Sequence, residues 1–333
     1  MNRRSFLGTT LATVALFEGR APAAEGIDEV GYVRVGGIDQ WIAIQGDDAK
    51  NPVLLYLHGG PAEAQSPFLA AFRPWEQRFT VVNWDQRGSG KTFERNGEST
   101  PDVTVKRMAL DAIDVANYAR RRLGKQKIIV VCQSFGCILG LAAVQQRPDI
   151  FAAYVGTGQP VNWILSLNAR EAFAREQMTA AHDTAAIQTL DAALALPPTS
   201  SKRLDASIKW RWSASDRQYL DLEKQFVSAS ATADEKADVA AWLAGGDFSG
   251  PKLWPAITSF DARRMTDFSV PIFVIQGRDD HITSFSAAKA WVDSLRAPAK
   301  AFVAIDGGHF ACFTDSSQFL VALESLVTPY RNE

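Results

Sequence analysis

Three short segments of the chain carry side chains that could act together in nucleophilic catalysis. Ser134 stands in CQSFGC, directly after the apolar run 127–132, so its hydroxyl is expected at a sharp turn between a strand and a helix. GRDDHIT supplies Asp279 and Asp280, and DGGHF supplies His309, each after another apolar run. A histidine takes the proton of an attacking serine, and a carboxylate holds the histidine in the correct tautomer. These segments predict a serine nucleophile whose base is His309.

The turn around Ser134 resembles the nucleophile elbow of the α/β-hydrolases, whose usual pattern is G-x-S-x-G. Cys132 takes the place of the first glycine, and it is small enough for the close approach of the neighbouring helix. In those enzymes the catalytic residues follow the order serine, acid, histidine, which is also the order here. The resemblance implies an acyl-enzyme mechanism without a cofactor. No metal-binding spacing such as H-E-x-x-H occurs, so no metal is expected.

The other three histidines are weaker candidates for the base. His182 lies in a polar helical stretch and is expected to be solvated, while His281 directly follows the candidate acid. His58 begins HGGPA, a glycine-rich loop that we expect it to support. The backbone N–H groups of Gly60 and Phe135 are then the expected donors to the oxyanion, as in the α/β-hydrolases.

A different chemistry is suggested by WDQRGSGKT at 84–92, because it ends like a nucleotide-binding P-loop. The pattern G-x-x-x-x-G-K-[ST] requires a glycine where this chain has Asp85, whose carboxylate would repel a phosphate. The following FERNGESTP has the composition of a turn, where a P-loop needs the start of a helix. The sequence therefore argues against a nucleotide site.

The candidate residues follow buried-strand patterns that alternate with helical patterns. Gly36 and Gly37 separate YVRV from QWIAI, as in a hairpin. Between Pro101 and Gly124 apolar residues recur at helical spacing, and Gly124 marks the helix end. The runs that indicate buried strands are VLLYLH (53–58), FTVVNW (79–84), KIIVVC (127–132), FAAYVG (151–156), PIFVIQG (271–277) and KAFVAI (300–305). Strands separated by helices predict an α/β fold with a mostly parallel sheet flanked by helices.

The interval 160–260 breaks this alternation. It is rich in Ala, Glu, Lys and Leu at helical spacing, and it holds five of the nine tryptophans, namely Trp163, Trp210, Trp212, Trp242 and Trp254. We interpret it as a helical cap over the carboxyl ends of the strands, where a parallel sheet binds its ligands. The core is then expected to comprise residues 25–159 and 261–333.

Composition excludes several classes of partner. The chain has 333 residues, of which 47% are apolar, so it can bury a large core. With 35 basic and 37 acidic residues its net charge is −2, and no run of Lys or Arg is long enough to indicate a nucleic-acid surface. A small peptide or ester is the expected partner, and the sequence gives no indication of the oligomeric state.

The first 24 residues differ from the rest of the chain. Residues 1–4 are basic at two positions, residues 6–17 are apolar, and APAA at 21–24 has the small residues of a cleavage site. The apolar stretch is too short to span a membrane, and NRRSFL resembles a twin-arginine export signal. We expect a signal peptide over residues 1–24, no membrane span in the mature chain, and a periplasmic or secreted location.

In their order and spacing, LHGGP, NWDQRGSGKT, CQSFG, GRDD and GGHF resemble the proline iminopeptidase family of α/β-hydrolases. The resemblance covers nearly all of the chain after the signal. It implies that Asp280 is the acid, from the family's G-x-x-D pattern, and that the cap lies between the sixth and seventh strands. It also implies that DQRG is a structural turn in which Asp85 pairs with Arg87. The implied activity is the release of N-terminal proline, or of other residues, from peptides.

Members of that family hold the substrate's ammonium with carboxylates of the cap, often in a Trp-Glu pair, and this insertion contains no such dipeptide. Glu171, Glu176 and Glu223 are the candidates for this role, with Trp210 and Trp212 as apolar contacts. The chain also departs from the family in HGGPA, where many members have a further glycine, and in the residue after the nucleophile, where tryptophan is common.

Other activities of the same fold remain as alternatives at this point. A carboxylesterase, lactonase or amidase with the same three residues would differ only in the cap. An epoxide hydrolase or haloalkane dehalogenase would need a carboxylate in place of Ser134. A binding protein without catalysis would be expected to have lost one of the three residues. The sequence therefore predicts a serine hydrolase, with a carboxylesterase or lactonase for small esters as the alternative to the peptidase.

Overall fold

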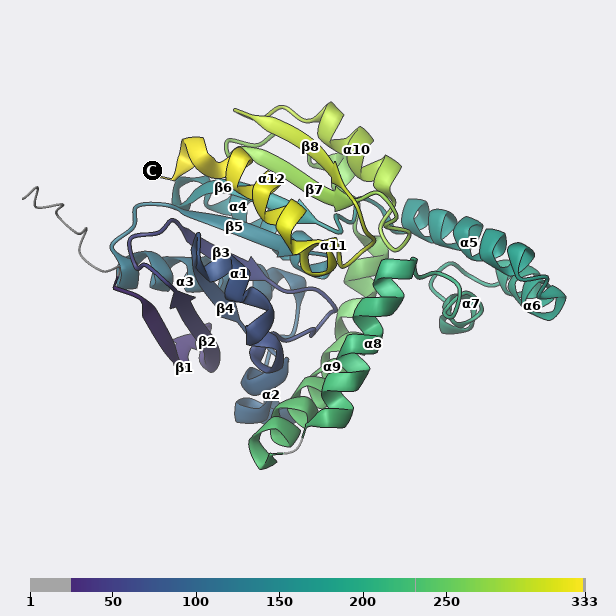
Figure 1. Cartoon of the computed structure of the whole chain (residues 1–333), viewed down its shortest axis with the longest axis horizontal. Coiled ribbons are helices and arrows are strands. Elements are labelled where there is room, and N and C mark those ends of the chain that lie inside the picture. The colour runs from purple at the N-terminus through teal and green to yellow at the C-terminus, as the bar shows by residue number, and fades with distance from the viewer. Residues whose placement is uncertain (1–24, 231, 332–333) are drawn as a thin grey trace, which may run out of the picture.

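The computed structural model describes residues 25–230 and 232–331, so the predicted signal peptide at 1–24 lies outside the described residues. Eight strands form one sheet in the order β1-β2-β4-β3-β5-β6-β7-β8 (Figure 1). They are β1 (Ile27–Val35), β2 (Ile38–Gly46), β3 (Val53–Leu57), β4 (Thr80–Trp84), β5 (Ile128–Gln133), β6 (Phe151–Thr157), β7 (Ile272–Gly277) and β8 (Lys300–Ile305). Each run that the sequence assigns to a strand is a strand in the structure.

The sheet is antiparallel at one edge and parallel elsewhere. β2 pairs antiparallel with both β1 and β4, and every pair from β4 to β8 is parallel. Gly36 and Gly37 form the predicted hairpin turn between β1 and β2, with φ angles of 54° and 84° that a residue with a side chain rarely adopts. The mostly parallel sheet predicted from the sequence is confirmed.

Helices cover both faces of the sheet, which explains why its strands read as continuous apolar runs. Along β3, Leu55 faces one layer, while its neighbours Leu54 and Tyr56 face the other. The first face is covered by α3 (Val105–Leu123), α4 (Phe135–Gln146) and α10 (Phe285–Ser294), and the second by α1 (Arg73–Glu76) and α12 (Ser316–Val327). Two further helices of the core are α2 (Gly90–Asn96) and α11 (Ala311–Thr314).

Helix α3 lies within the predicted interval and has clear signals at both ends. The side chain of Thr104 accepts a hydrogen bond from the N–H of Arg107, which satisfies one of the free donors of the first turn. Gly124 ends the helix in the left-handed conformation. Among the described residues, none of the helices is both long and apolar enough to cross a membrane.

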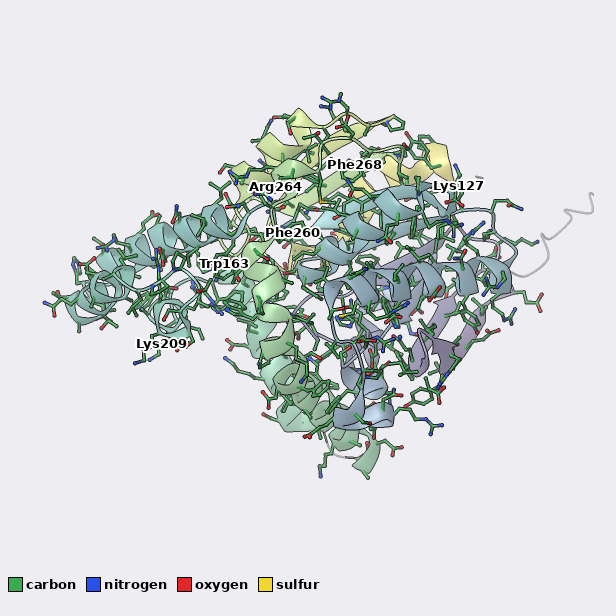
Figure 2. All side chains as sticks on the ribbon, turned by 180° about the vertical axis from the view of Figure 1, so that it is seen from behind. Lys127, Trp163, Lys209, Phe260, Arg264 and Phe268 are labelled. Atoms are coloured by element: carbon green, nitrogen blue, oxygen red, sulfur yellow. The ribbon has the colours of Figure 1, made fainter. Side chains whose placement is uncertain are left out.

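A helical cap is inserted between β6 and β7, as the resemblance implies. Its helices are α5 (Trp163–Ala180), α6 (Thr184–Leu194), α7 (Ser201–Asp205), α8 (Ala214–Ala229) and α9 (Ala233–Ser259). The chain enters and leaves the cap at one place, because Asn162 and Asp261 form an isolated antiparallel bridge. Figure 2 labels Trp163 and Phe260 beside this junction, while α5 and α6 extend away from the sheet and α8 runs along α9 (Figure 1).

The turn after β4 differs from the prediction in two respects. FERN belongs to helix α2 and not to a turn, because Ser89 is extended and a helix begins at Gly90. Asp85 does not pair with Arg87. Its carboxylate is fully buried and accepts hydrogen bonds from three backbone N–H groups, those of Gln65, Ser66 and Lys91. Asp85 therefore fixes the loop through the backbone, and the charge of Arg87 is neutralised elsewhere.

The partner of Arg87 is Asp111 of α3. Their side chains form a bidentate ion pair with distances of 2.7 and 3.2 Å, and both are buried. The guanidinium also donates to the carbonyl oxygens of Pro101 and Gly36, at 3.0 and 2.8 Å. The pairing differs from the prediction because residues two apart in a turn are less well placed for a bidentate contact than a helix side chain that faces the loop.

Candidate active site

Four loops meet at the carboxyl edge of the sheet, because the strands that precede them are parallel neighbours. Ser134 follows β5, Asp280 follows β7, His309 follows β8 and Gly60 follows β3. A cavity of about 430 Å³ opens at this edge beneath the cap. Ser134, His309, Gly60 and Phe135 all line it. The structure therefore brings the predicted nucleophile, base and oxyanion donors to one place.

Ser134 has a strained backbone, with φ 51° and ψ −117°, at the point where β5 turns into α4. Its N–H donates to the carbonyl of Thr157, which ties the turn to the end of β6. The turn is tightly packed: a Cβ added to Gly136 would lie 2.1 Å from the carbonyl oxygen of Leu57. The sequence forms this elbow because Gly136 allows α4 to approach β3.

Cys132 replaces the usual first glycine of the elbow without disturbing it. The facing residue of α4 is Gly140, and a Cβ there would lie only 2.2 Å from the sulfur of Cys132. In the usual elbow a glycine before the serine leaves room for the helix. Here Gly140 of the helix leaves room for the side chain of Cys132 instead. Cys132, Cys137 and Cys312 are all buried and unpaired, and burial raises the pKa of each thiol, so they are inert small apolar groups.

His309 and Asp280 form a buried hydrogen bond of 3.0 Å between Nδ1 and Oδ2. The other oxygen of Asp280 accepts from the N–H groups of Ile282 and Thr283, each at 2.9 Å. Burial by itself raises the pKa of Asp280, but the nearby imidazole and the hydrogen bonds outweigh it, so this pKa lies below its ordinary value. Asp280 is thus held ionised beside His309, whereas Asp279 is exposed.

A cap residue fixes the backbone next to His309. Asp216 of α8 is fully buried, and its Oδ1 accepts from the N–H of Phe310 at 3.1 Å. Its other oxygen accepts from the hydroxyl of Ser213 at 2.7 Å. Gly308 allows this contact, since a Cβ there would lie 2.2 Å from the Asp216 carboxylate. The loop that carries His309 is therefore held between the sheet and the cap.

The two predicted oxyanion donors, Phe135 and Gly60, line the same cavity as Ser134 and come from different segments of the chain. Phe135 begins α4, where the N–H groups of the first turn have no acceptor within the helix. Gly60 has a φ of 105°, and a Cβ there would lie 2.7 Å from the backbone nitrogens of Ala62 and Glu63. The loop after β3 can take this shape only with glycine, which leaves its backbone facing the cavity.

His58 supports this loop, as the sequence predicts. It is fully buried, and its Nε2 accepts from the N–H of Gln86 at 3.1 Å, while Nδ1 lies 3.0 Å from the carbonyl oxygen of Gly59. These contacts fit a neutral ring with the proton on Nδ1, and burial lowers the pKa of His58 to about 4. His58 thus joins the HGGPA loop to the DQRG turn.

A pair of carboxyl groups stands where the HGGPA loop meets the cap. Glu63 lines the main cavity, and Glu223 of α8 lines the neighbouring one. Burial raises the pKa of Glu63, and the nearby charge of Glu223 raises it further, against a hydrogen bond from Trp242. Burial likewise raises the pKa of Glu223, which is hydrogen-bonded to Tyr219. Burial and the proximity of the two groups thus both disfavour their ionised forms, which a nearby cation would stabilise.

The other predicted cap residues have different positions. Trp212 lines the main cavity, but Trp210 packs on the cap's own small core, with Met178 among its members. Glu171 makes two hydrogen bonds of 2.7 and 2.8 Å to the guanidinium of Arg203, so its charge is already neutralised. Glu176 is exposed on α5. The structure does not bring Trp210, Glu171 or Glu176 to the cavity.

Sequence analysis missed four charged residues of the site: Glu63, Asp216, Arg170 and Arg211. Glu63 could have been found, since it follows HGGPA directly, in the loop already assigned to the oxyanion. Arg170 and Asp216 stand in helices of the cap and Arg211 in the loop before α8, none of them in a local motif, and only the packing of the cap places them. Within residues 25–230 and 232–331, no group of three or more His, Cys, Asp or Glu side chains could hold a metal ion.

Comparison with known proteins agrees with this geometry. The family model of the alpha/beta hydrolase fold matches residues 52–316. The probable aminopeptidase YbaC of Bacillus subtilis (strain 168) is 28% identical over 286 residues, which cover 84% of this chain and 89% of that protein. A probable proline iminopeptidase of Streptomyces coelicolor is 34% identical over 103 residues, or 31% of each chain.

Solved structures show the same fold. Proline iminopeptidase from Mycobacterium smegmatis superposes with a TM-score of 0.64 at 20% identity, over 91% of this chain and 99% of that one. A proline iminopeptidase-related protein from Thermus thermophilus gives a TM-score of 0.61 at 20% identity, over 92% and 99%. The resemblance to proline iminopeptidases inferred from the motifs is confirmed by these relatives, and the chain belongs to the alpha/beta hydrolase fold family.

Proposed function

We propose that this protein is a serine aminopeptidase that releases N-terminal residues, proline above all, from peptides. The observation that carries the proposal is the buried hydrogen bond of 3.0 Å between Asp280 and His309, since His309 lines the same cavity as the strained Ser134. The names of the relatives, probable aminopeptidase and probable proline iminopeptidase, point to the same reaction.

The chemistry follows from the positions of the residues. His309 takes the proton of Ser134 as the hydroxyl oxygen attacks the peptide carbonyl, and the N–H groups of Phe135 and Gly60 stabilise the oxyanion. His309 then passes the proton to the leaving amine as the C–N bond breaks, which leaves an acyl-enzyme. Water attacks this ester with His309 again as base, and the N-terminal residue is released. Asp280 holds the imidazole in the required tautomer throughout.

Specificity for a free N-terminus is assigned to Glu63 and Glu223. An α-ammonium bound beside them would form charge-assisted hydrogen bonds and would favour the ionised forms that burial and the proximity of the two groups otherwise disfavour. The cavity wall is largely apolar, with Trp163, Trp212 and Phe260 among its residues. A small ring such as that of proline suits such a wall.

The test compares proline 4-nitroanilide with N-acetylproline 4-nitroanilide on the mature protein, with 4-nitrophenyl butyrate as a control for the serine chemistry. Acetylation removes the cation and should lower kcat/KM by at least about 100-fold, because the carboxylate pair then remains unpaired. Equal rates on the two anilides, or faster turnover of the butyrate ester than of the free proline anilide, would favour the carboxylesterase or lactonase function instead.

A further inference from the structure

Two arginines of the cap line the same cavity as Ser134, and the catalytic steps use neither of them. Arg170 of α5 is only 6% exposed, and Arg211 precedes α8. Arg170 donates from Nη2 to the carbonyl of Ile282 at 3.0 Å, and its guanidinium lies over the ring of Trp163 at 5.3 Å. The guanidinium of Arg211 lies over the ring of Trp212 at 4.9 Å. Aromatic faces thus hold both cations in the wall of the cavity.

Both guanidinium groups are left incompletely satisfied. The Nε atoms of Arg170 and Arg211 are buried, and neither has a hydrogen-bond partner among the described residues. Within the same part of the chain, neither arginine forms an ion pair with a carboxylate. Two carboxylates nearby are already engaged, Glu171 by Arg203 and Asp280 by His309. Asp205 also lines the cavity and its charge acts on Arg211, but it is exposed and forms no ion pair with Arg211 in the described part of the chain.

The two positive charges act on each other. Burial lowers the pKa of Arg170 to about 10, and the charge of Arg211 lowers it further while Asp280 and Glu171 oppose the shift. Arginine is almost never buried without a partner, because the cost of losing its hydration is not recovered. Two guanidinium groups without a carboxylate partner, Arg170 buried and Arg211 partly buried, in a wall open to substrate are therefore arranged for an anion.

Glu63 lines the same cavity, but it belongs to the loop after β3 and not to the cap that carries the two arginines. The neighbours that perturb its pKa are Glu223 and Trp242, and neither arginine is among them. The cavity thus offers separate sites for a cation and for an anion. A ligand with both charges, a small zwitterion, complements it better than an ester or amide without charge.

We propose that Arg170 and Arg211 bind a carboxylate of the substrate. This inference rests on the proposed function for its substrate class: with the α-ammonium at Glu63, the carboxylate is the C-terminus of the same molecule, which makes the substrate a dipeptide. The two ends of an extended dipeptide are about 7 Å apart, and a cavity of about 430 Å³ holds such a molecule. Charge-assisted hydrogen bonds from a planar guanidinium fork suit a carboxylate oxygen pair.

The kinetic test compares prolyl-leucine with prolyl-leucinamide, by the release of leucine or leucinamide. The wild-type enzyme should favour the free carboxylate by about 10- to 100-fold in kcat/KM, as expected for charge-assisted hydrogen bonds. Arg211→Met should abolish this preference by raising KM for the dipeptide alone, and Arg170→Met should do the same. The matched control is Arg175→Gln on α5, whose side chain pairs with Asp191 away from the cavity. Equal kcat/KM for the two substrates with the wild-type enzyme would overturn the proposal.

A binding test separates this proposal from the aminopeptidase function, because it needs no turnover. N-Acetylleucine, which has a carboxylate and no ammonium, should bind the wild-type chain in isothermal titration calorimetry at least about 10-fold more tightly than N-acetylleucinamide. Arg211→Met should lose this difference and Arg175→Gln should keep it. If neither proline substrate is cleaved but the carboxylate still binds through Arg211, the anion site stands and the aminopeptidase fails. Equal binding of the two ligands would overturn the anion site.

Discussion

One buried arginine lies at the edge of the sheet and another lies in the cap. The two side chains differ in how many of their guanidinium nitrogens have hydrogen-bond partners. At the sheet edge, all three nitrogens of Arg87 donate to Asp111, Pro101 or Gly36. In the cap, Arg170 has one hydrogen bond to protein, and its Nε has none among the described residues. A satisfied buried charge serves the fold, whereas an unsatisfied one beside a cavity is kept for a ligand.

The sheet edge and the cap also differ in how their residues are positioned. Ser134, Asp280 and His309 follow strands of one sheet, and short loops with local hydrogen bonds fix their positions. Glu223 and the two cap arginines come from helices and loops that are far from one another in sequence. We therefore expect the sheet edge to carry the bond-breaking chemistry, and the cap, together with Glu63 of the HGGPA loop, to select the molecule that is held there. The following predictions test this division.

The largest effect is expected at the sheet edge. Asp280→Asn should lower kcat by about 10³- to 10⁴-fold, because an amide in place of the carboxylate favours the wrong tautomer of His309. Asp279→Asn is the matched control, since Asp279 is exposed. Steady-state assays on proline 4-nitroanilide measure both variants, and a larger loss in Asp279→Asn would transfer the role of the acid to Asp279.

The two buried arginines should differ in stability. Arg87→Met should lower the free energy of unfolding by about 3 kcal/mol, because it leaves Asp111 buried with only Arg107 as partner. Arg170→Met should change that free energy by no more than about 1 kcal/mol, since loss of one hydrogen bond is offset by removal of an unpaired buried charge. Urea unfolding followed by tryptophan fluorescence measures both. A larger loss in Arg170→Met would make Arg170 a structural residue.

The carboxylate pair should affect binding and pH dependence together. Glu63→Gln should raise KM for proline 4-nitroanilide by about 10- to 100-fold, because the ammonium loses a charged acceptor. Burial raises the pKa of Glu63 from 4.5 to about 8, so the folded protein retains a proton that the unfolded chain releases. The contribution of Glu63 to stability therefore falls as the pH rises through that window.

Glu63→Gln removes this titration. Its melting temperature, measured by calorimetry from pH 5 to pH 8.5, should fall less steeply with pH than that of the wild type. A variant with the same pH dependence and the same KM as the wild type would show that Glu63 neither titrates in this range nor binds the substrate.

The smallest effect on activity is expected at Asp216, the cap residue that holds the loop with His309. Asp216→Ala should lower kcat by about tenfold with little change in KM, because the loop with His309 loses the acceptor for the Phe310 N–H. Asp216→Asn keeps an oxygen acceptor and should restore most of the activity. Equal losses in the two variants would mean that the charge of Asp216, and not its hydrogen bond, is what matters.

The sequence predicts the sheet edge well because its signals are local. A strand, a glycine pattern and a reactive side chain stand together in CQSFGC, and the predicted strands are confirmed. Asp85 and Arg87 show the limit, since the resemblance implied that they pair, whereas the actual partner of Arg87, Asp111, lies on α3. That contact depends on the packing of a distant helix and has no trace in the DQRG motif.

The cap was predicted less well for the same reason. Helical spacing identifies a cap, but it does not show which side of a helix faces the cavity. Glu171 and Arg170 are neighbours in sequence, yet Glu171 pairs with Arg203 and Arg170 lines the cavity. Helix–helix packing decides between the two positions, and one sequence carries little information about it.

The central claim is that Ser134 is the nucleophile, and covalent labelling tests it most directly. The wild-type protein is treated with a fluorophosphonate, and the modified peptide is identified by mass spectrometry while activity on proline 4-nitroanilide is followed. We predict one label, on Ser134, with loss of activity in proportion to labelling, and neither label nor turnover in a folded Ser134→Ala variant. Labelling of another residue in step with inactivation, or turnover by Ser134→Ala at the wild-type rate, would contradict the claim.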